Sequence, residues 1–153
     1  MMIIERASEE DFEHICAMDE TGIRARGQRE IIARSLARDR VYVARADGKV
    51  RGFLILEQSF YGNGFISLLL VQEQWRRQGV ATTPMRNAER DCPTAKIFTS
   101  TNESNIPMRC LCERIGYVST GRIENLDEGD PEIVYFKSLA DAPGPGADVV
   151  DDE

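Results

Sequence analysis

Three strand-like segments follow one another in the first half of the chain, and the turns between them are short. The segments cover residues 41–44, 50–58 and 65–71. Asp47-Gly48 accepts positive φ angles at low cost and is typical of a two-residue hairpin turn, and Gly62-Asn63-Gly64 predicts a second turn. Strands joined by such short turns run antiparallel, so the sequence predicts a meander within a sheet.

Helices are predicted on either side of this meander in the sequence. Ser8 followed by Asp11 resembles a capping box with Asp in place of Glu, so a helix is expected over 8–19, and Gly116 marks the end of a later helix. The remaining predicted elements are helices at 27–39, 79–91 and 106–114 and strands at 96–101, 117–123 and 133–137. With a strand at the amino terminus, the order is β-α-α-β-β-β-α-β-α-β-β, which indicates an α+β fold around a mixed sheet.

The end of the chain differs in composition from the rest. Residues 141–153 contain Pro143-Gly144-Pro145-Gly146 and five acids, with no Lys or Arg, which is typical of a disordered tail. The whole chain has 153 residues with 26 acids and 19 bases, so removing the five tail acids leaves 21 against 19 and changes the net charge from −7 to −2. We therefore expect one nearly neutral domain over 1–140 and an acidic tail over 141–153.

Several classes of partner are disfavoured by the composition. An acidic chain does not suit nucleic acid, which is bound mainly through Lys and Arg. The longest nearly unbroken apolar run, 65–71, is far shorter than the roughly 20 residues of a membrane span, and the amino terminus lacks the parts of a signal peptide. We therefore expect a cytoplasmic protein with no membrane partner. The single His and the absence of a CxxC pair predict no metal site and free thiols at Cys16, Cys92, Cys110 and Cys112.

The segment from Leu68 to Thr82 has the order strand, loop, helix. Several N–H groups at a helix start lack intrahelical partners, and the helix dipole adds partial positive charge, so such an end binds phosphate oxygens. Gly79 lets the backbone approach a ligand, and the small Ala81 does not shield it. Neither GxxxxGK[ST] nor GxGxxG occurs, which excludes the P-loop and the dinucleotide-binding fingerprint. The segment predicts a phosphate site of another kind.

The loop Arg76-x-x-Gly79-x-Ala81 resembles the [Q/R]-x-x-G-x-[G/A] signature of the GNAT superfamily of acetyltransferases. A second segment, 105–117, resembles the family's N-x-x-A-x-x-L-Y-x-x-x-G-F pattern, although Met108 replaces Ala and Cys112 replaces Tyr. The two segments stand in the family's order, and the resemblance extends to the element order of residues 2–138. The positions that match or are conservatively replaced in the second segment are Asn105, Leu111, Gly116 and Tyr117.

The resemblance implies a GNAT fold, in which a mostly antiparallel mixed sheet carries helices on both faces. Two parallel strands splay apart, and acetyl-CoA, the cosubstrate, lies between them. Arg76 and Arg77 would add positive charge near the pyrophosphate, or one of them is only solvated, and Asn105 would contact the pantetheine arm, cap its helix, or do both. The residues implied in binding acetyl-CoA are Leu70, Val71, Arg76, Arg77, Gln78, Gly79, Val80, Ala81, Thr82 and Asn105.

The reaction implied is direct acetyl transfer from the thioester to the primary amine of a small molecule. An alkylammonium titrates near 10.4, so it must lose a proton to a base or a relay. The family's positions for a carboxylate base correspond to Phe65 and Ser100, neither of which is acidic, so Glu57 and Glu73 are the candidates, with a chain of waters as the alternative. Cys112 stands where the family has a Tyr acid, and its thiol either donates a proton to the departing thiolate or is a passive buried residue.

Two charged segments bear on the acceptor. Residues 124–132 hold five acids and no base, which indicates either an acidic rim at the acceptor opening or a solvated turn. Residues 24–51 hold nine bases and three acids, so Arg24 or Arg26 could meet a carboxylate on an amino-acid-like acceptor, or this segment is a solvated helix face. His14 is expected to be structural or exposed.

Two other functions stay open at this level. The acceptor could be the amine of a protein or peptide, because the sequence does not give the width of the cleft. The protein could also be an acyl-CoA-binding module with weak catalysis, because the usual Tyr is missing. A homodimer is a further partner left open.

Overall fold

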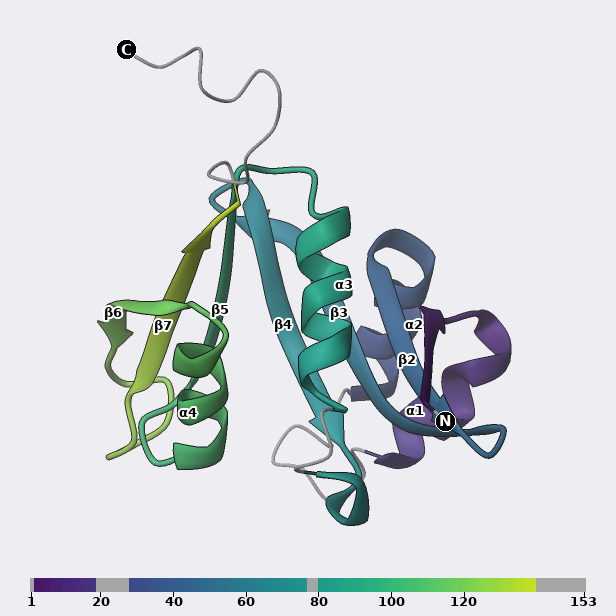
Figure 1. The fold of residues 1–153 in the computed structure, drawn as a ribbon. Coiled ribbons are helices and arrows are strands. Elements are labelled where there is room, and N and C mark those ends of the chain that lie inside the picture. Colours follow the sequence, from purple (N-terminus) through teal and green to yellow (C-terminus); the bar gives the residue numbers. More distant parts are fainter. Residues whose placement is uncertain (1, 19–27, 77–79, 140–153) are drawn as a thin grey trace.

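The computed structural model describes residues 2–18, 28–76 and 80–139. Within these residues the strands form one seven-stranded sheet in the order β1-β2-β3-β4-β5-β7-β6 (Figure 1). All neighbours are antiparallel except β4 and β5, which run parallel, so the predicted mixed sheet is confirmed. The strands are β1 (Met2–Arg6), β2 (Arg40–Ala46), β3 (Lys49–Phe60), β4 (Asn63–Val71), β5 (Lys96–Asn102), β6 (Val118–Ile123) and β7 (Glu132–Ser138).

The predicted meander is formed by β2, β3 and β4, and each strand extends beyond its predicted limits. Asp47 and Gly48 have φ angles of 56° and 75°, as expected for the first hairpin turn. The second turn lies earlier than predicted, because Tyr61 and Gly62 take the positive φ angles and Asn63 already begins β4. The Asn63 side chain donates a hydrogen bond to the carbonyl of Phe60 at 3.3 Å, which holds this turn closed.

Helices cover both faces of the sheet, as the GNAT resemblance implies. In Figure 1, α3 and α4 lie on the near face, and α1 and α2 lie on the other face. The predicted helix over 106–114 is confirmed, whereas the one predicted over 79–91 begins only at Thr82. The helices are α1 (Phe12–Met18), α2 (Gln28–Arg38), α3 (Thr82–Asp91) and α4 (Ile106–Arg114), and two short 3-10 helices are η1 (Glu9–Asp11) and η2 (Glu73–Trp75).

The two faces of the sheet pack separate cores. The core under α3 and α4 includes Tyr42, Leu54, Leu56, Ile66, Met85, Ile97, Leu111, Cys112, Ile133 and Tyr135. The core under α1 and α2 includes Ile15, Cys16, Ile32, Val41, Val43, Phe53 and Ile55. Successive side chains of a strand point to opposite faces of the sheet. The core to which a strand side chain belongs therefore shows which face it points to.

Local signals explain the helices on the second face. The Ser8 N–H donates to the Asp11 carboxylate at 2.9 Å, the contact expected of the predicted capping box, although the first turn is 3-10 rather than α. On α2, Ile32 and Ser35 are buried, whereas Ile31 is 36% exposed. Residues three and four apart lie on the same face of a helix. Ile32, Ser35 and Leu36 therefore form the face of α2 that points to the sheet, and Ile31 lies outside it.

The remaining predictions concern residues that the structure does not describe, the four cysteines, and membrane-spanning helices. The tail over 141–153 and the bases Arg24 and Arg26 lie outside the described residues. All four cysteines are described and are free thiols, as predicted. Among the described residues, no helix has the length and apolar content needed to cross a membrane.

Candidate active site

The two parallel strands at the centre of the sheet separate along their length. β4 pairs with β5 only through Gly64, Phe65 and Ile66, which face Ile97, Phe98 and Thr99. Beyond that point the strands diverge, and Figure 1 shows the gap widening towards the loop that follows β4. The splayed parallel strands implied by the resemblance are therefore present.

An extra residue in β4 lies at the point where the strands part. Leu56 of β3 faces Ile66, and the next residue of β3, Ile55, faces Leu68, so Ser67 has no partner across the pair. This is a β-bulge, which bends the strand that carries it and raises its twist. The bulge follows directly on the last residue that pairs with β5, and it accounts for the bend of β4 away from β5.

The edge of β4 beyond the bulge presents backbone groups to the gap. The Gln72 N–H donates to the carbonyl of Arg51 on β3 at 2.9 Å, so in an antiparallel ladder Leu70 also directs its backbone to β3. By the same alternation, Leu69 and Val71 direct their N–H and C=O groups towards the gap. Leu70 was predicted to bind acetyl-CoA there, but its backbone faces β3. Leu69, whose backbone faces the gap, was not among the predicted residues, because the ladder register is not visible in the sequence.

The open end of the gap leads to the start of α3. Ala81 is the N-cap residue of α3 and carries no side-chain cap for the first turn, and Val80 before it is buried. The guanidinium of Arg76 turns back along the gap, and its Nε donates to the carbonyl of Val71 at 3.0 Å. The uncapped first turn of α3 carries the partial positive charge of a helix start, and helix starts of this kind can bind phosphate oxygens. Arg77, Gln78 and Gly79 lie outside the described residues.

Asn105 begins α4 on the opposite side of the gap. Its Oδ1 accepts a hydrogen bond from the Met108 N–H at 3.3 Å, so its predicted role as a helix cap is confirmed. Its Nδ2 donates to the hydroxyl of Thr101 on β5 at 3.1 Å. The side chain therefore ties the helix start to the β5 side of the gap.

Cys112 lies inside the core under α3 and α4. It is fully buried, and this burial raises the pKa of its thiol to about 12, with the nearby Glu113 adding to the rise. A thiol with so high a pKa is poorly matched to a thiol leaving group near 8.5. The burial favours the interpretation of Cys112 as a passive core residue.

The predicted bases lie in different places. Glu57 lies on β3 directly opposite Phe65, where its Oε1 accepts a hydrogen bond from the Ser59 hydroxyl at 2.7 Å. Glu73 is exposed in η2, past the end of β4 and beside Arg76. Glu57 is thus near one of the two family positions for a base, and Glu73 is at the open end of the gap.

The second family position also has a neighbouring carboxylate. The Ser100 hydroxyl donates to Oε2 of Glu132 at 2.7 Å, and Glu132 is only 8% exposed. In the sequence, Glu132 is one acid among the five of 124–132 and carries no separate signal. Only the pairing of β5 with β7 brings it beside Ser100, so sequence reasoning missed it.

Most other acids of the segment 124–132 hold the turn in place. Asp127 accepts from the Asn102 amide at 2.8 Å, and Asp130 accepts from the hydroxyl and the N–H of Ser104 at 2.6 and 3.1 Å. Glu124 is paired with Arg122 at 2.7 Å. The segment is therefore neither a uniform acidic rim nor a merely solvated turn.

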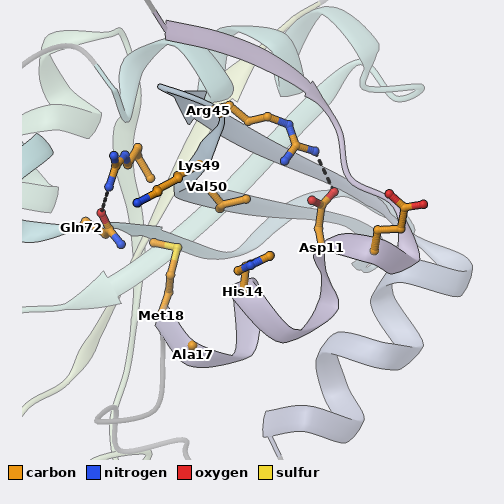
Figure 2. Close-up of a pocket in the computed structure, with 11 residues that line it drawn as sticks. Asp11, His14, Ala17, Met18, Arg45, Lys49, Val50 and Gln72 are labelled. Atoms are coloured by element: carbon orange, nitrogen blue, oxygen red, sulfur yellow. Dashed lines mark hydrogen bonds and ion pairs between the residues drawn. The ribbon is translucent and has the colours of Figure 1, made fainter.

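A hollow of about 550 Å³ lies on the α1 side of the sheet. Figure 2 shows His14, Ala17 and Met18 of α1 on one side and Arg45, Lys49 and Val50 of the β2–β3 hairpin on the other, with Gln72 at one end. Gln72 follows Val71 directly, so the hollow adjoins the open end of the gap. His14 is exposed, as expected, and its side chain lines the hollow.

The splayed parallel pair and the helix that starts at its open end are the features that place this fold in a class of protein. A family model described as acetyltransferase (GNAT) family matches residues 3–117. The chain belongs to this family and is, at that level, an acyl-transferring enzyme.

Solved structures with the same fold support this assignment. A GNAT family acetyltransferase from Bacillus cereus ATCC 10987 is 35% identical, with a TM-score of 0.84 over 90% of this chain and 97% of that one. An Elizabethkingia anophelis GNAT acetyltransferase with acetyl-CoA bound is 15% identical, with a TM-score of 0.69 over 90% of this chain and 97% of that one. Arabidopsis thaliana NAA60 in complex with a bisubstrate analogue is 13% identical, with a TM-score of 0.77 over 90% and 98%. The last two show the fold alone. Comparison with curated proteins gives no match.

Proposed function

We propose that this protein transfers the acetyl group of acetyl-CoA to a primary amine of a small molecule. The observation that carries the proposal is the gap between β4 and β5, which begins at the Ser67 bulge and ends at the start of α3. The presence of acetyl-CoA in the Elizabethkingia anophelis protein of the same fold supports the choice of donor.

The residues around the gap fit such a donor. The pantetheine arm contains amide groups, and Leu69 and Val71 offer it a strand edge with which those amides can pair. The first-turn amides of α3, next to Ala81 and Thr82, suit the pyrophosphate. We expect Arg76 to contribute to its binding, together with Arg77, Gln78 and Gly79, which lie outside the described residues. With the phosphates at the open end, the thioester lies towards the closed end of the gap.

The groups that serve the chemistry lie at this closed end. A carboxylate that takes the proton of the ammonium frees the nitrogen lone pair for attack on the thioester carbon. Glu57 and Glu132 both lie on the α1–α2 face of the sheet near this end, whereas Glu73 lies at the other end of β4. Val71 and Ser67 are four residues apart along β4, roughly 13 Å, which separates the two ends clearly.

The experiment is a thiol-release assay with acetyl-CoA and a panel of amines, run beside a direct binding measurement by calorimetry. The panel contains alkylamines, aromatic amines, polyamines, amino acids and a short peptide with a free amino terminus. Thiol release with at least one small amine, and acetylated product by mass spectrometry, supports the proposal. Turnover of the peptide alone would make the protein a peptide acetyltransferase, and acetyl-CoA binding without any turnover would make it a binding module.

A further inference from the structure

The face of the sheet that α1 and α2 share carries a buried carboxylate close to the closed end of the gap. Glu132 begins β7 and points away from the core under α3 and α4, because Ile133 and Tyr135 point into that core. Its carboxylate reaches over β5 and accepts the hydroxyl hydrogen of Ser100 at 2.7 Å. Ser100 follows Thr99, the last residue of β5 that pairs with β4. The carboxylate therefore lies next to the point where the two strands part.

Glu132 has no cationic partner among the described residues. The strand β6, which pairs with β7, carries the base Arg122. Arg122 faces Ile133 and so lies on the other face of the sheet, where it pairs with Glu103 and Glu124. A carboxylate that is more than nine-tenths buried is costly without a cation or a full set of hydrogen bonds. A ligand with an ammonium group would supply the missing positive charge.

The turn before Glu132 fixes its position. The Asn102 amide donates to the Asp127 carboxylate and to the carbonyl of Asp130, and the Glu103 N–H donates to the carbonyl of Pro131 at 2.8 Å. These bonds fasten the start of β7 to the end of β5. The carboxylate is therefore held in place before any ligand binds.

Beside this carboxylate, the same face carries a row of phenylalanines. Phe98 lies two residues before Ser100, and its ring centroid is 5.5 Å from that of Phe136 and 4.9 Å from that of Phe60. Phe60 in turn stacks on Phe65 at 5.2 Å. All four rings are only partly buried. Two residues along a strand span about 7 Å, so the row lies within one short alkyl chain of the carboxylate.

We infer that this face is the acceptor site, and that its acceptor is a primary amine on an apolar, ring-bearing body. Glu132 receives the ammonium and takes its proton, Ser100 is the positioning residue that orients Glu132, and the phenylalanine row holds the ring. This inference rests on the proposed function, because it names the acceptor class of the same cleft.

The ammonium gives one proton to Glu132, and the freed lone pair forms a C–N bond to the thioester carbonyl carbon. The C–S bond breaks, and the thiolate leaves with the electron pair. The nitrogen loses its second proton and the thiolate gains one, so that the products are the amide and the free thiol. Glu132 returns its proton to solvent.

The experiment compares phenethylamine, hexylamine and ethanolamine as acceptors at saturating acetyl-CoA. For the wild type, we expect kcat/KM for phenethylamine to exceed that for ethanolamine by about 10-fold or more. Glu132→Gln is expected to lower kcat for phenethylamine by about 100-fold or more while leaving acetyl-CoA binding unchanged. The matched control is Glu128→Gln, which removes an exposed acid of the same turn, and Glu57→Gln tests the competing carboxylate.

Two further variants separate positioning and ring binding from folding. Ser100→Ala is expected to lower kcat, and Ser100→Thr to restore it, since only the hydroxyl is needed. Phe98→Leu keeps an apolar side chain and is expected to raise KM for phenethylamine about 10-fold while leaving that for ethanolamine unchanged. If Glu132→Gln does not fold, the wild-type preference and Phe98→Leu still decide the matter.

The results that would overturn the acceptor inference differ from those that would overturn the proposed function. Full activity of Glu132→Gln, loss of activity only in Glu57→Gln, or a wild-type preference for ethanolamine would overturn the inference and leave the proposed function standing. Acetyl-CoA binding without turnover of any amine would overturn both.

Discussion

The Thr99 hydroxyl donates a hydrogen bond to the carbonyl of Ile66 at 2.9 Å, and both residues are buried. This bond joins β5 to β4 at the last pair of residues before the two strands separate. It therefore fixes the closed end of the gap between the two strands.

Replacing Thr99 by Val should loosen this junction. The shape is conserved but the buried carbonyl of Ile66 loses a donor, so we expect the free energy of unfolding to fall by about 1–2 kcal/mol. Acetyl-CoA should also bind more weakly, because the gap is less well defined. Urea denaturation and calorimetry measure the two effects, and Thr99→Ser, which keeps the hydroxyl, is the control. Wild-type affinity in Thr99→Val would argue against this role of the bond.

Deleting Ser67 should separate folding from binding. Without the bulge, Ile66 and Leu68 become neighbours that face the same two residues of β3 as before, and each keeps its own side of the sheet. We therefore expect a folded protein in which β4 continues along β5 and the gap is closed. Circular dichroism should be native-like and acetyl-CoA binding lost. A deletion variant that still binds acetyl-CoA would show that the bulge does not set the gap.

These two predictions depend on features that the sequence only partly reveals. The element order and the antiparallel meander follow from turn lengths and apolar spacing, and the helices on both faces and the parallel pair follow from the two family-like segments. All of these signals are local. The bulge does not, because Leu68, Leu69 and Leu70 form an unbroken apolar run with no alternation to show which side each residue faces.

The same limit applies to the chemistry. Glu132 lies on β7 and is brought beside Ser100 by the pairing of β5 with β7. These two strands are separated in the chain by α4 and β6. Glu132 could be found from the sequence only with the register of that pair. The backbone role of Leu69 has the same origin, since the alternation of ladder hydrogen bonds depends on the register with β3.

Placing a carboxylate at the start of α3 should oppose phosphate binding. Ala81→Asp puts a negative charge beside the first-turn amides, where the helix dipole favours it, so the free energy of unfolding should rise by about 0.5 kcal/mol. The same charge repels the pyrophosphate, and we expect the dissociation constant of acetyl-CoA to rise about 10-fold or more at low salt. The neutral Ala81→Asn is the matched control. Equal affinities of the two variants would place the phosphates elsewhere.

The stability of the α1 region should depend on pH through Asp11. Burial by itself raises the pKa of Asp11, but the hydrogen bonds from Arg45 at 2.9 Å and from the Ser8 N–H outweigh it and hold that pKa below its ordinary value. A lowered pKa stabilises the fold at every pH above the unfolded-state value near 3.8, and this contribution is lost as the pH falls through the folded-state value. Asp11→Asn should therefore cost about 2 kcal/mol at neutral pH, and the difference should shrink below about pH 4.

Chemical denaturation at several pH values measures this difference. Glu13→Gln serves as the comparison, because the Glu13–Arg29 pair is exposed and contributes little. A constant difference between wild type and Asp11→Asn down to pH 3 would mean that the contact with Arg45 does not depend on the charge of Asp11.

Cys112 should behave as a core residue. Its thiol has a pKa raised to about 12 by burial, so it stays protonated at neutral pH and should react slowly with iodoacetamide, whereas the exposed Cys110 should react quickly. Cys112→Ala removes a buried sulfur and should lower the free energy of unfolding by about 1–2 kcal/mol while leaving kcat unchanged at every pH at which the enzyme is folded. Thermal unfolding, alkylation followed by mass spectrometry, and turnover with the best amine test these three points, with Cys110→Ala as the control. The contrary result would be a lower kcat for Cys112→Ala but not for Cys110→Ala, measured where bound acetyl-CoA restores the stability of the variant. That result would make Cys112 the proton donor to the departing thiolate.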